Sequence, residues 1–387
     1  MANIYVHVPF CRTFCKYCGF YSELSGRNGT AVAGYVKSLE YEIRERRDSC
    51  TDAMHTASCD TLYFGGGTPS LLSPEEVCSI ASAIGKRFGI DSFDEFTLEA
   101  NPDDIAGTSS CNGYLSSLRS AGVNRLSLGI QSFDDARLKF MNRRHDAAEA
   151  VAAFEAARNA GFDNISCDLI FGYGGLSLEG WKADINELLA LKPEHVSCYQ
   201  MSIERGSALE KLASSGRYSP LPDDECADQY ALLQSMLAAA GYEQYEVSNF
   251  ALPGFRSRHN SSYWERTPYV GFGPAAHSFD GACIRRWNLP DLSRYDRCYP
   301  GSGKCFCQEE LTGDDVFNEQ VMLSLRRVTG LDPQALDKER LSMERPDLDR
   351  LLDTGLLEYV PGTGMRMVRI PASKLFVSDS IIEELFV

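Results

Sequence analysis

Three cysteines stand within eight residues near the N-terminus, in the segment CRTFCKYC at positions 11–18. Clustered thiols in a chain that is neither short nor secreted more often hold metal than form disulfides. Zinc is one interpretation, but structural zinc normally takes four ligands, and no histidine follows these cysteines closely. Three thiolates fit a [4Fe–4S] cluster better, because they tie down three irons and leave the fourth open to an exogenous ligand. We therefore predict that Cys11, Cys15 and Cys18 bind a [4Fe–4S] cluster.

The elements that must position this loop alternate regularly from the N-terminus to about residue 205. The expected strands cover residues 3–9, 60–67, 96–102, 124–133, 164–173 and 195–203. Amphipathic helical patterns lie between them, as at 30–47, 73–88, 146–160 and 178–190. The strand candidates are near-continuous apolar runs, which is typical of strands buried on both faces of a parallel sheet. Six strand–helix units in a row predict an α/β fold with a partial parallel (β/α)6 barrel, and a doubly wound open sheet is the alternative.

Glycines and polar residues gather where successive strands end, which favours the barrel. These residues are Gly65 to Thr68, Glu99, Gln131 and Asp168. Barrel enzymes assemble their sites at the carboxyl ends of the strands. The first strand ends at Pro9, directly before the cysteine loop, so we expect the loop and these residues to share one mouth of the barrel.

The rhythm of the chain changes after residue 205. A helical pattern at 223–240 leads to a strand-like segment at 242–250 and then to a loop-rich, aromatic region. From residue 311 short helices and a small strand pair follow. We therefore expect three regions: a barrel core over 1–205, a barrel extension over 206–310, and a small, mainly helical C-terminal domain over 311–387 with a winged-helix character.

Composition and charge narrow the choice of partner and compartment. The formal net charge is −16 and no long run of Lys or Arg interrupts it, which argues against nucleic acid as a partner. No apolar run is long enough to span a bilayer, and the first residues do not resemble a secretion signal. We therefore expect a cytoplasmic protein without a transmembrane segment.

The remaining cysteines invite a plainer interpretation. Cys167 and Cys198 lie inside strand-like runs and fit small buried apolar residues. Cys298, Cys305 and Cys307 form a local group that could hold a second metal, but the group lacks histidine and its spacing is uncommon. For this group we prefer a surface turn of reduced thiols.

The spacing C-x3-C-x2-C resembles the cluster motif of the radical S-adenosylmethionine (SAM) superfamily. With the preceding YVHVPF, it is similar to the branch that contains oxygen-independent coproporphyrinogen III dehydrogenase and its haem-chaperone relative. The resemblance extends along nearly the whole chain through the segments YFGGGTPSLL, LEANPDD, GIQSFDD, DLIFGY and HNSSYW, which occur in this order. It implies that SAM chelates the open iron, and that one electron cleaves SAM to a 5′-deoxyadenosyl radical.

The resemblance also implies a set of cofactor-binding residues. Carried over by matching motifs, these are Tyr5, Tyr17, Gly66, Gly67, Thr68, Glu99, Gln131, Arg143, Asp168, Gln200 and His277. A glycine triplet alone is more often a tight turn, and its place after a strand is what favours SAM binding. Arg144 is the alternative to Arg143, and the spacing from Gln131 favours Arg143.

Two features separate the branches of this family. The coproporphyrinogen enzyme carries a fourth cysteine two residues after the third, where this chain has Phe20, and the haem-chaperone branch has an aromatic residue there. The segment HNSSYW resembles the HNxxYW motif that is associated with haem binding in the chaperone branch. This implies that His259 is an axial haem ligand, with Tyr263 and Trp264 beside the macrocycle. The alternative is a structural, hydrogen-bonded histidine.

The sequence thus favours a haem chaperone that binds a [4Fe–4S] cluster, SAM and haem, and passes haem to acceptor haemoproteins. It would be a carrier without coproporphyrinogen dehydrogenase activity, with an electron-donor protein as partner and a homodimer as a possible state. The alternatives are an oxygen-independent coproporphyrinogen III dehydrogenase and a radical SAM enzyme that modifies haem. The intact GGGTP and LEANP segments keep radical chemistry open.

Overall fold

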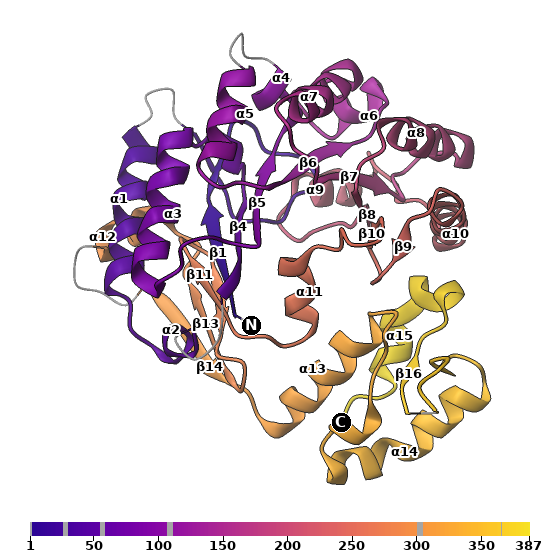
Figure 1. Ribbon diagram of the computed structural model, residues 1–387. Helices are drawn as coiled ribbons and strands as arrows, with labels where there is room; N and C mark the ends of the chain where they lie inside the picture. The colour runs from indigo at the N-terminus through magenta and orange to yellow at the C-terminus, as the bar shows by residue number, and fades with distance from the viewer. Residues whose placement is uncertain (1, 26–29, 55–58, 107–110, 300–304, 365) are drawn as a thin grey trace.

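The computed structural model describes residues 2–25, 30–54, 59–106, 111–299, 305–364 and 366–387 (Figure 1). Six parallel strands form the centre, in the order β1 (Ala2–Val8), β4 (Cys59–Gly66), β5 (Glu95–Ala100), β6 (Arg125–Gln131), β7 (Ile165–Phe171) and β8 (His195–Gln200). The main helices outside this sheet are α1 (Thr30–Glu45), α3 (Pro74–Phe88), α5 (Cys111–Ser120), α7 (Ala147–Asn159), α8 (Leu178–Leu191) and α10 (Asp223–Ala239). The predicted partial parallel barrel is confirmed.

Both edges of the six-stranded core are extended. On one side β11 (Tyr269–Phe272) pairs parallel with β1, and β12 (His277–Phe279), β13 (Ile284–Asn288) and β14 (Phe306–Glu310) continue antiparallel. On the other side β10 (Asn249–Ala251) pairs antiparallel with β8 and is followed by β9 (Glu243–Gln244). The expected strand at 242–250 is therefore two short strands. Because β14 and β9 stand at opposite ends of the strand order, the described sheet stays open.

The strands of the core are buried on both faces, as expected, but only one of the two faces is apolar. The outward side chains are apolar, as Ile4, Val6 and Val8 show in β1. The inward side chains are mostly polar and include Asn3, His7, Thr61, Thr97, Arg125, Ser127, Ser166, His195 and Ser197, all of them buried. Hydrogen bonds join several of them, as between Thr61 and Asn3 and between Ser166 and His195, whereas Asn3 Nδ2 and Arg125 Nε have no partner in the described part of the chain. Short hydroxyl and aromatic side chains made these runs read as apolar in the sequence.

Helix α11 (Arg258–Trp264) closes the amino-terminal end of the barrel. The carboxylate of Glu95, at the start of β5, accepts hydrogen bonds from the backbone N–H groups of Arg258 at 2.8 Å and His259 at 2.9 Å. The Ser257 hydroxyl also donates to Glu95, at 3.2 Å. A negative charge at a helix N-terminus is favourable. This end of the barrel is opposite to the end where the cysteine loop follows β1.

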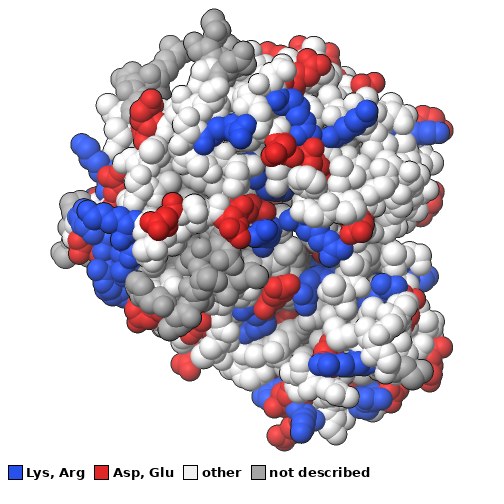
Figure 2. All heavy atoms as spheres, viewed as in Figure 1, with Lys and Arg blue, Asp and Glu red and all other residues white. Residues whose placement is uncertain are grey.

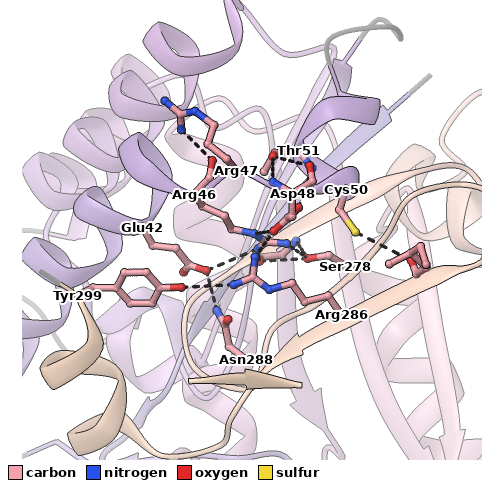
Figure 3. Close-up of polar contacts among 12 residues, drawn as sticks. Glu42, Arg46, Arg47, Asp48, Cys50, Thr51, Ser278, Arg286, Asn288 and Tyr299 are labelled. Atoms are coloured by element: carbon pink, nitrogen blue, oxygen red, sulfur yellow. Dashed lines mark hydrogen bonds and ion pairs between the residues drawn. The ribbon is translucent and has the colours of Figure 1, made fainter. Parts of the chain in front are cut away.

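A buried polar network attaches the sheet extension to α1 (Figure 3). Glu42 accepts hydrogen bonds from Asn288 Nδ2 at 2.8 Å and from Tyr295 in α12 (Leu292–Cys298) at 2.7 Å. Arg46 donates to Ser278 Oγ in β12 at 2.9 Å and pairs with Asp48 at 2.6 Å. The network therefore holds β12, β13 and α12 against the end of α1 and the start of α2 (Ser49–Ala53).

The C-terminal region packs below the barrel in Figure 1. It contains α13 (Gly313–Leu325), α14 (Lys338–Asp353), α15 (Ser378–Glu383), the short turns η2 (Pro333–Ala335) and η3 (Ala372–Val377), and the pair β15 (Glu358–Tyr359) and β16 (Val368–Arg369). Acidic and basic side chains are interspersed over the face that Figure 2 presents. Among the described residues, no helix combines the length and the apolar character that crossing a membrane would require.

The scattered cysteines are mostly buried. Cys167 and Cys198 are enclosed by the core, as expected. Cys298 and Cys305 are buried too, against the expectation of a surface turn, and burial together with the adjacent Cys298 thiol raises the pKa of Cys305 to about 12. Residues 300–304 of the expected turn lie outside the described residues.

Candidate functional site

A cavity of about 960 Å³ opens at the carboxyl ends of the core strands. Twelve of the fifteen predicted site residues line it, namely Cys11, Cys15, Cys18, Tyr17, Gly66, Gly67, Thr68, Glu99, Gln131, Arg143, Asp168 and Gln200. The other three lie elsewhere: Tyr5 and His277 line a second cavity, and His259 is buried beneath the barrel core. The tertiary structure therefore brings together residues that are spread over 190 positions of the chain.

The cysteine loop runs between β2 (Phe10–Cys11) and β3 (Glu23–Leu24) and is held from two sides. Its Lys16 N–H donates to the Met141 carbonyl at 3.1 Å, and the Lys16 carbonyl accepts from the Leu209 N–H of α9 (Ala208–Ser214) at 2.8 Å. Tyr17 packs against the small apolar cluster formed by Met141, Ile170, Met201, Leu209 and Tyr218. These contacts fix the loop at the mouth of the barrel.

The three thiols face the same cavity and influence one another. Burial raises the pKa of the Cys18 thiol to about 11, and the neighbouring Cys15 and Cys11 thiols add to this rise. Thr68 Oγ1 lies 3.5 Å from the Cys11 sulfur, and a guanidinium nitrogen of Arg143 lies 3.5 Å from the Cys15 sulfur. A metal that binds here must displace protons from these thiols.

The metal-binding candidates of this cavity are three soft thiols. Within the described part of the chain, no three His, Cys, Asp or Glu side chains converge closely enough to hold one ion. Cys11, Cys15 and Cys18 are nevertheless half-buried around one cavity wall. Soft thiol donors that share a cavity without meeting at one point suit a multi-iron cluster.

The glycine triplet is required by close packing at the ends of β1 and β4. Gly66 has φ +112°, which favours glycine, and a Cβ there would lie 2.7 Å from the His7 ring. A Cβ on Gly67 would lie 2.6 Å from the Phe10 carbonyl oxygen. Bare backbone at both positions lets the cysteine loop approach β4, and leaves Gly66 and Gly67 on the cavity wall.

Glu99 is the carboxylate at the end of β5. It accepts hydrogen bonds from Tyr63 Oη at 2.8 Å and from the Gly66 N–H at 3.2 Å. Burial raises the pKa of Glu99 to about 7, and the nearby Asp168 carboxylate adds to this rise. The two hydrogen bonds act in the opposite direction and lower the pKa, but they do not outweigh burial. Near neutral pH a part of the Glu99 carboxyl groups is therefore protonated, and a protonated carboxyl must lose its proton before it can pair with a cation.

Replacing Glu99 with Gln should stabilise the ligand-free protein at pH 8 by about 1–3 kcal/mol. Because folding raises the pKa of this carboxyl, the folded state binds more protons than the unfolded state between pH 4.5 and 7. Stability of the wild type therefore falls as pH rises through that window, and Gln removes the fall. Urea unfolding at pH 8 and pH 4.5 checks this, since the gain should vanish at pH 4.5. An equal gain at both pH values would contradict it.

Arg143 and Arg144 point to different partners. A guanidinium nitrogen of Arg143 donates to Asn101 Oδ1 and to the Gly129 carbonyl, both at 2.6 Å, and the side chain reaches Cys15. Arg144 is exposed and pairs with Asp103 at 3.3 Å. The arginine that the spacing favoured is thus the one that turns toward the cysteine loop.

Gln131 ends β6, whereas Asp168 lies in the middle of β7 and not at its end, where the sequence predicted it. Gln131 has φ +69°, a left-handed conformation that is costly for a residue with a Cβ and is often found at functional sites. Asp168 accepts hydrogen bonds from Ser127 Oγ at 3.1–3.2 Å and from Ser166 Oγ at 3.3 Å, and burial raises the pKa of its carboxyl. Gln200 ends β8 on the exposed side of the cavity.

Several cavity residues were missed in the sequence. They are Tyr63, Asn101, Arg125, Ser127, Ser197 and Tyr199. Arg125 is buried and its positive charge acts on both Glu99 and Asp168. Most of them could have been found from the alternation of side chains along a strand. Every second residue of β4, β5, β6 and β8 points into the barrel, and these inward positions hold polar residues up to the mouth.

His259 lies under the barrel with both ring nitrogens engaged. Nδ1 is 2.7 Å from Thr61 Oγ1 and Nε2 is 2.8 Å from Tyr263 Oη. The ring stacks on Tyr63 with centroids 4.9 Å apart, and burial lowers the pKa of His259 to about 3. In this arrangement the imidazole is neutral and hydrogen-bonded at both ends.

Comparison with known proteins gives the superfamily that the cysteine spacing indicated. The profile of the Radical SAM superfamily matches residues 5–188. "Heme chaperone HemW" of Lactococcus lactis is 34% identical over 329 residues, which cover 85% of this chain and 82% of that protein. The protein of the same name from Mycobacterium tuberculosis is 31% identical over 385 residues, or 99% and 94% of the two chains.

A solved structure shares the fold over the whole chain. It is the coproporphyrinogen III oxidase HemN from Escherichia coli, described as a radical SAM enzyme. It matches with a TM-score of 0.80 at 22% identity, over 100% of this chain and 90% of the other. At this identity the likeness concerns the fold alone.

Proposed function

Because this chain belongs to the radical SAM superfamily and, within it, to the family of the heme chaperone HemW, we propose that it is a haem carrier with a [4Fe–4S] cluster and bound SAM. It would accept haem and transfer it to acceptor haemoproteins. An electron-donor protein and a second copy of the chain are further partners in this proposal. The observation that carries it is a cavity where three thiols, a carboxylate and bare glycine backbone meet, next to Phe20 in place of a fourth cysteine.

The cavity's own residues support the binding of both groups. Cys11, Cys15 and Cys18 would hold the cluster, which when bound supplies electrons. The carboxylate of Glu99 suits an ammonium or ribose hydroxyls, and the free backbone at Gly66 and Gly67 suits an amino-acid moiety. The aromatic face of Tyr17 lines the same cavity and suits an adenine ring.

Loss of the Glu99 charge should weaken SAM binding even though it stabilises the fold. We expect Glu99→Gln to raise the Kd for SAM about tenfold to hundredfold, because a charge-assisted hydrogen bond contributes about 1.5–3 kcal/mol. Equilibrium dialysis with the cluster-loaded protein measures this. Glu155→Gln, on the outer helix α7 and exposed, is the matched control and should leave SAM binding unchanged.

An axial role for His259 remains a prediction from its motif, and the structure sets a condition on it. Iron can bind Nε2 only after the hydrogen bond to Tyr263 is lost and α11 moves, because the ring is 1% exposed. As a structural residue, His259 has a clear task, since it joins α11 to Thr61 of β4. Its two roles predict different results for the variant.

His259→Ala is expected to lower the free energy of unfolding by about 2–4 kcal/mol, because it leaves a cavity and removes the hydrogen bonds between the imidazole and the Thr61 and Tyr263 hydroxyls. Urea unfolding measures this loss. A variant that loses haem but keeps full stability would contradict the structural task and support direct ligation. His145→Ala removes another buried, hydrogen-bonded histidine of the chain and serves as the control for the loss of a buried imidazole outside α11.

A second candidate function is oxygen-independent coproporphyrinogen III dehydrogenase. The observation that favours it is that nine of the eleven predicted SAM residues line the same cavity as the cysteine loop. Anaerobic incubation of the reconstituted protein with SAM, a reductant and either coproporphyrinogen III or haemin separates the two. The carrier retains haemin, delivers it to apomyoglobin and leaves coproporphyrinogen unchanged. Decarboxylation in step with 5′-deoxyadenosine release would overturn the carrier, and loss of haem would indicate a haem-modifying enzyme.

A further inference from the structure

A second cavity, of about 510 Å³, lies between β1 and the inner face of the sheet extension. Its walls are rich in rings: Tyr5, Tyr21, Tyr263, Tyr269 and Phe279 all line it. Tyr263 and Tyr269 meet edge to face with centroids 4.8 Å apart. Aromatic walls of this kind suit a flat, largely apolar ligand.

The polar groups of this cavity carry a positive excess. Arg285 pairs with Glu319 of α13 at 2.6 Å, and Arg266 contacts the other oxygen of the same carboxylate. These three are the charged residues of the cavity lining, so two guanidinium groups face one carboxylate. Both guanidinium groups also lie over the Phe279 ring, at 4.8 Å for Arg266 and 5.8 Å for Arg285. In a chain of net charge −16, such a place can receive the carboxylates of an anionic ligand.

One histidine completes the lining. Among the five histidines that the structure describes, His7, His145, His195 and His259 are buried with hydrogen bonds to their rings. His277 is exposed, faces the cavity, and makes no ring hydrogen bond to the described part of the chain. It stacks on Trp287 with centroids 5.7 Å apart at 13°, which orients the imidazole. Histidine is the commonest metal ligand among the side chains, and this ring is open to the cavity.

We propose that this second cavity is the tetrapyrrole site, with His277 as the axial ligand to the iron and Arg266 and Arg285 as partners of the propionate carboxylates. The inference rests on the proposed haem-carrier function and names the place and the ligand. It assigns His259 to the support of the cavity wall, through its hydrogen bond to Tyr263.

Two structural links make this place suited to a carrier. Gly19 and Phe20 line both cavities, so the residue that replaces the fourth cysteine stands between the cysteine loop and the tetrapyrrole. Phe20 is 73% exposed, and a flat ligand would cover it. The wall itself is rigid, because Ser278 and Arg286, the neighbours of His277 and Arg285, turn to the opposite side into the buried network (Figure 3).

Haemin titration of the full-length protein tests the proposal with four variants. His277→Ala should remove the Soret spectrum of an imidazole-ligated haem, and His277→Cys should convert it to the spectrum of a thiolate ligand. Arg285→Gln should raise the Kd for haemin about tenfold to hundredfold, whereas Arg256→Gln, an exposed arginine paired with Glu243, should not. Iron porphyrin dimethyl ester, which lacks free carboxylates, should bind wild type and Arg285→Gln equally.

The outcomes are distinct. If wild type does not bind haemin, both the carrier function and this inference fail. If wild type binds haemin and His277→Ala and His277→Cys keep its spectrum and affinity, this inference alone is overturned. Circular dichroism of the variants excludes loss of fold, which is not expected because His277 is exposed.

Discussion

Replacing Cys15 with alanine is expected to reduce the iron and sulfide content of anaerobically reconstituted protein from about four of each per chain to near zero. Cys15 is one of three thiols on a single loop, and no fourth cysteine is close in sequence to take its place. Loss of one thiol leaves two anchors, which cannot hold the cluster against chelators. Iron analysis and the brown cluster absorbance measure the effect, and SAM binding that depends on the cluster should be lost with it.

Cys78→Ser is the matched control for this experiment. Cys78 is an exposed free cysteine on α3, outside the cavity, so its loss should leave iron, sulfide and colour unchanged. Full iron content in Cys15→Ala, or equal loss in Cys78→Ser, would show that the cluster is not held where the loop predicts.

Replacing Arg46 with methionine is expected to lower the free energy of unfolding by about 3–5 kcal/mol. The Arg46 guanidinium lies between the carboxylates of Glu42 and Asp48, at 3.5 and 2.6 Å, and donates to the Gly271 carbonyl at 2.7 Å. All of these groups are buried or half-buried. Without Arg46 they keep their desolvation and lose their partner, which costs more than the pair itself contributes. Urea unfolding at pH 7 measures this loss.

The same variant has a defined pH dependence. Burial alone would raise the pKa of Asp48, but the Arg46 and Arg286 charges outweigh it and lower that pKa. A carboxyl with a lowered pKa stabilises the fold above its ordinary value near 4, and loses this contribution as pH falls through the folded value. The difference between wild type and Arg46→Met should therefore shrink below about pH 4. Arg44→Met, in the last turn of α1 just before Arg46 but exposed, should cost less than about 1 kcal/mol, and a larger loss would contradict the argument from burial.

Much of the site could be predicted because its residues belong to short sequence motifs. The cysteine spacing, the glycine triplet at the end of β4, Glu99 near the end of β5 and Asp168 within β7 can each be recognised within about ten residues of sequence. Parallel strands place such segments at one edge of the sheet, so a list of strand ends becomes a list of neighbours. Together with the family resemblance, which supplied residues such as Tyr17 and Arg143, these segments predicted the twelve residues that line one cavity.

Other features depend on segments that meet only in the folded chain. The polar interior of the barrel was missed because threonine, serine and tyrosine do not interrupt an apolar run clearly. Only the packing of the folded chain shows whether these side chains point into the barrel or outward. The buried network of Glu42, Arg46 and Arg286 joins residues more than 230 positions apart, and each of them alone resembles an ordinary surface charge. The local sequence pattern does not predict contacts between such distant residues.

The histidines show most clearly what the sequence determines and what only the tertiary structure determines. By itself, the sequence determined the superfamily and the barrel and supplied the proposal for the cluster ligands, because each depends on short-range spacing or on the alternation of strands and helices. Only the tertiary structure decided which imidazole is accessible: His259 has its nitrogens bound to Thr61 and Tyr263, whereas His277 faces a cavity. The physical reason is that burial and hydrogen bonding, which govern whether a side chain can bind a ligand, arise from contacts between distant segments.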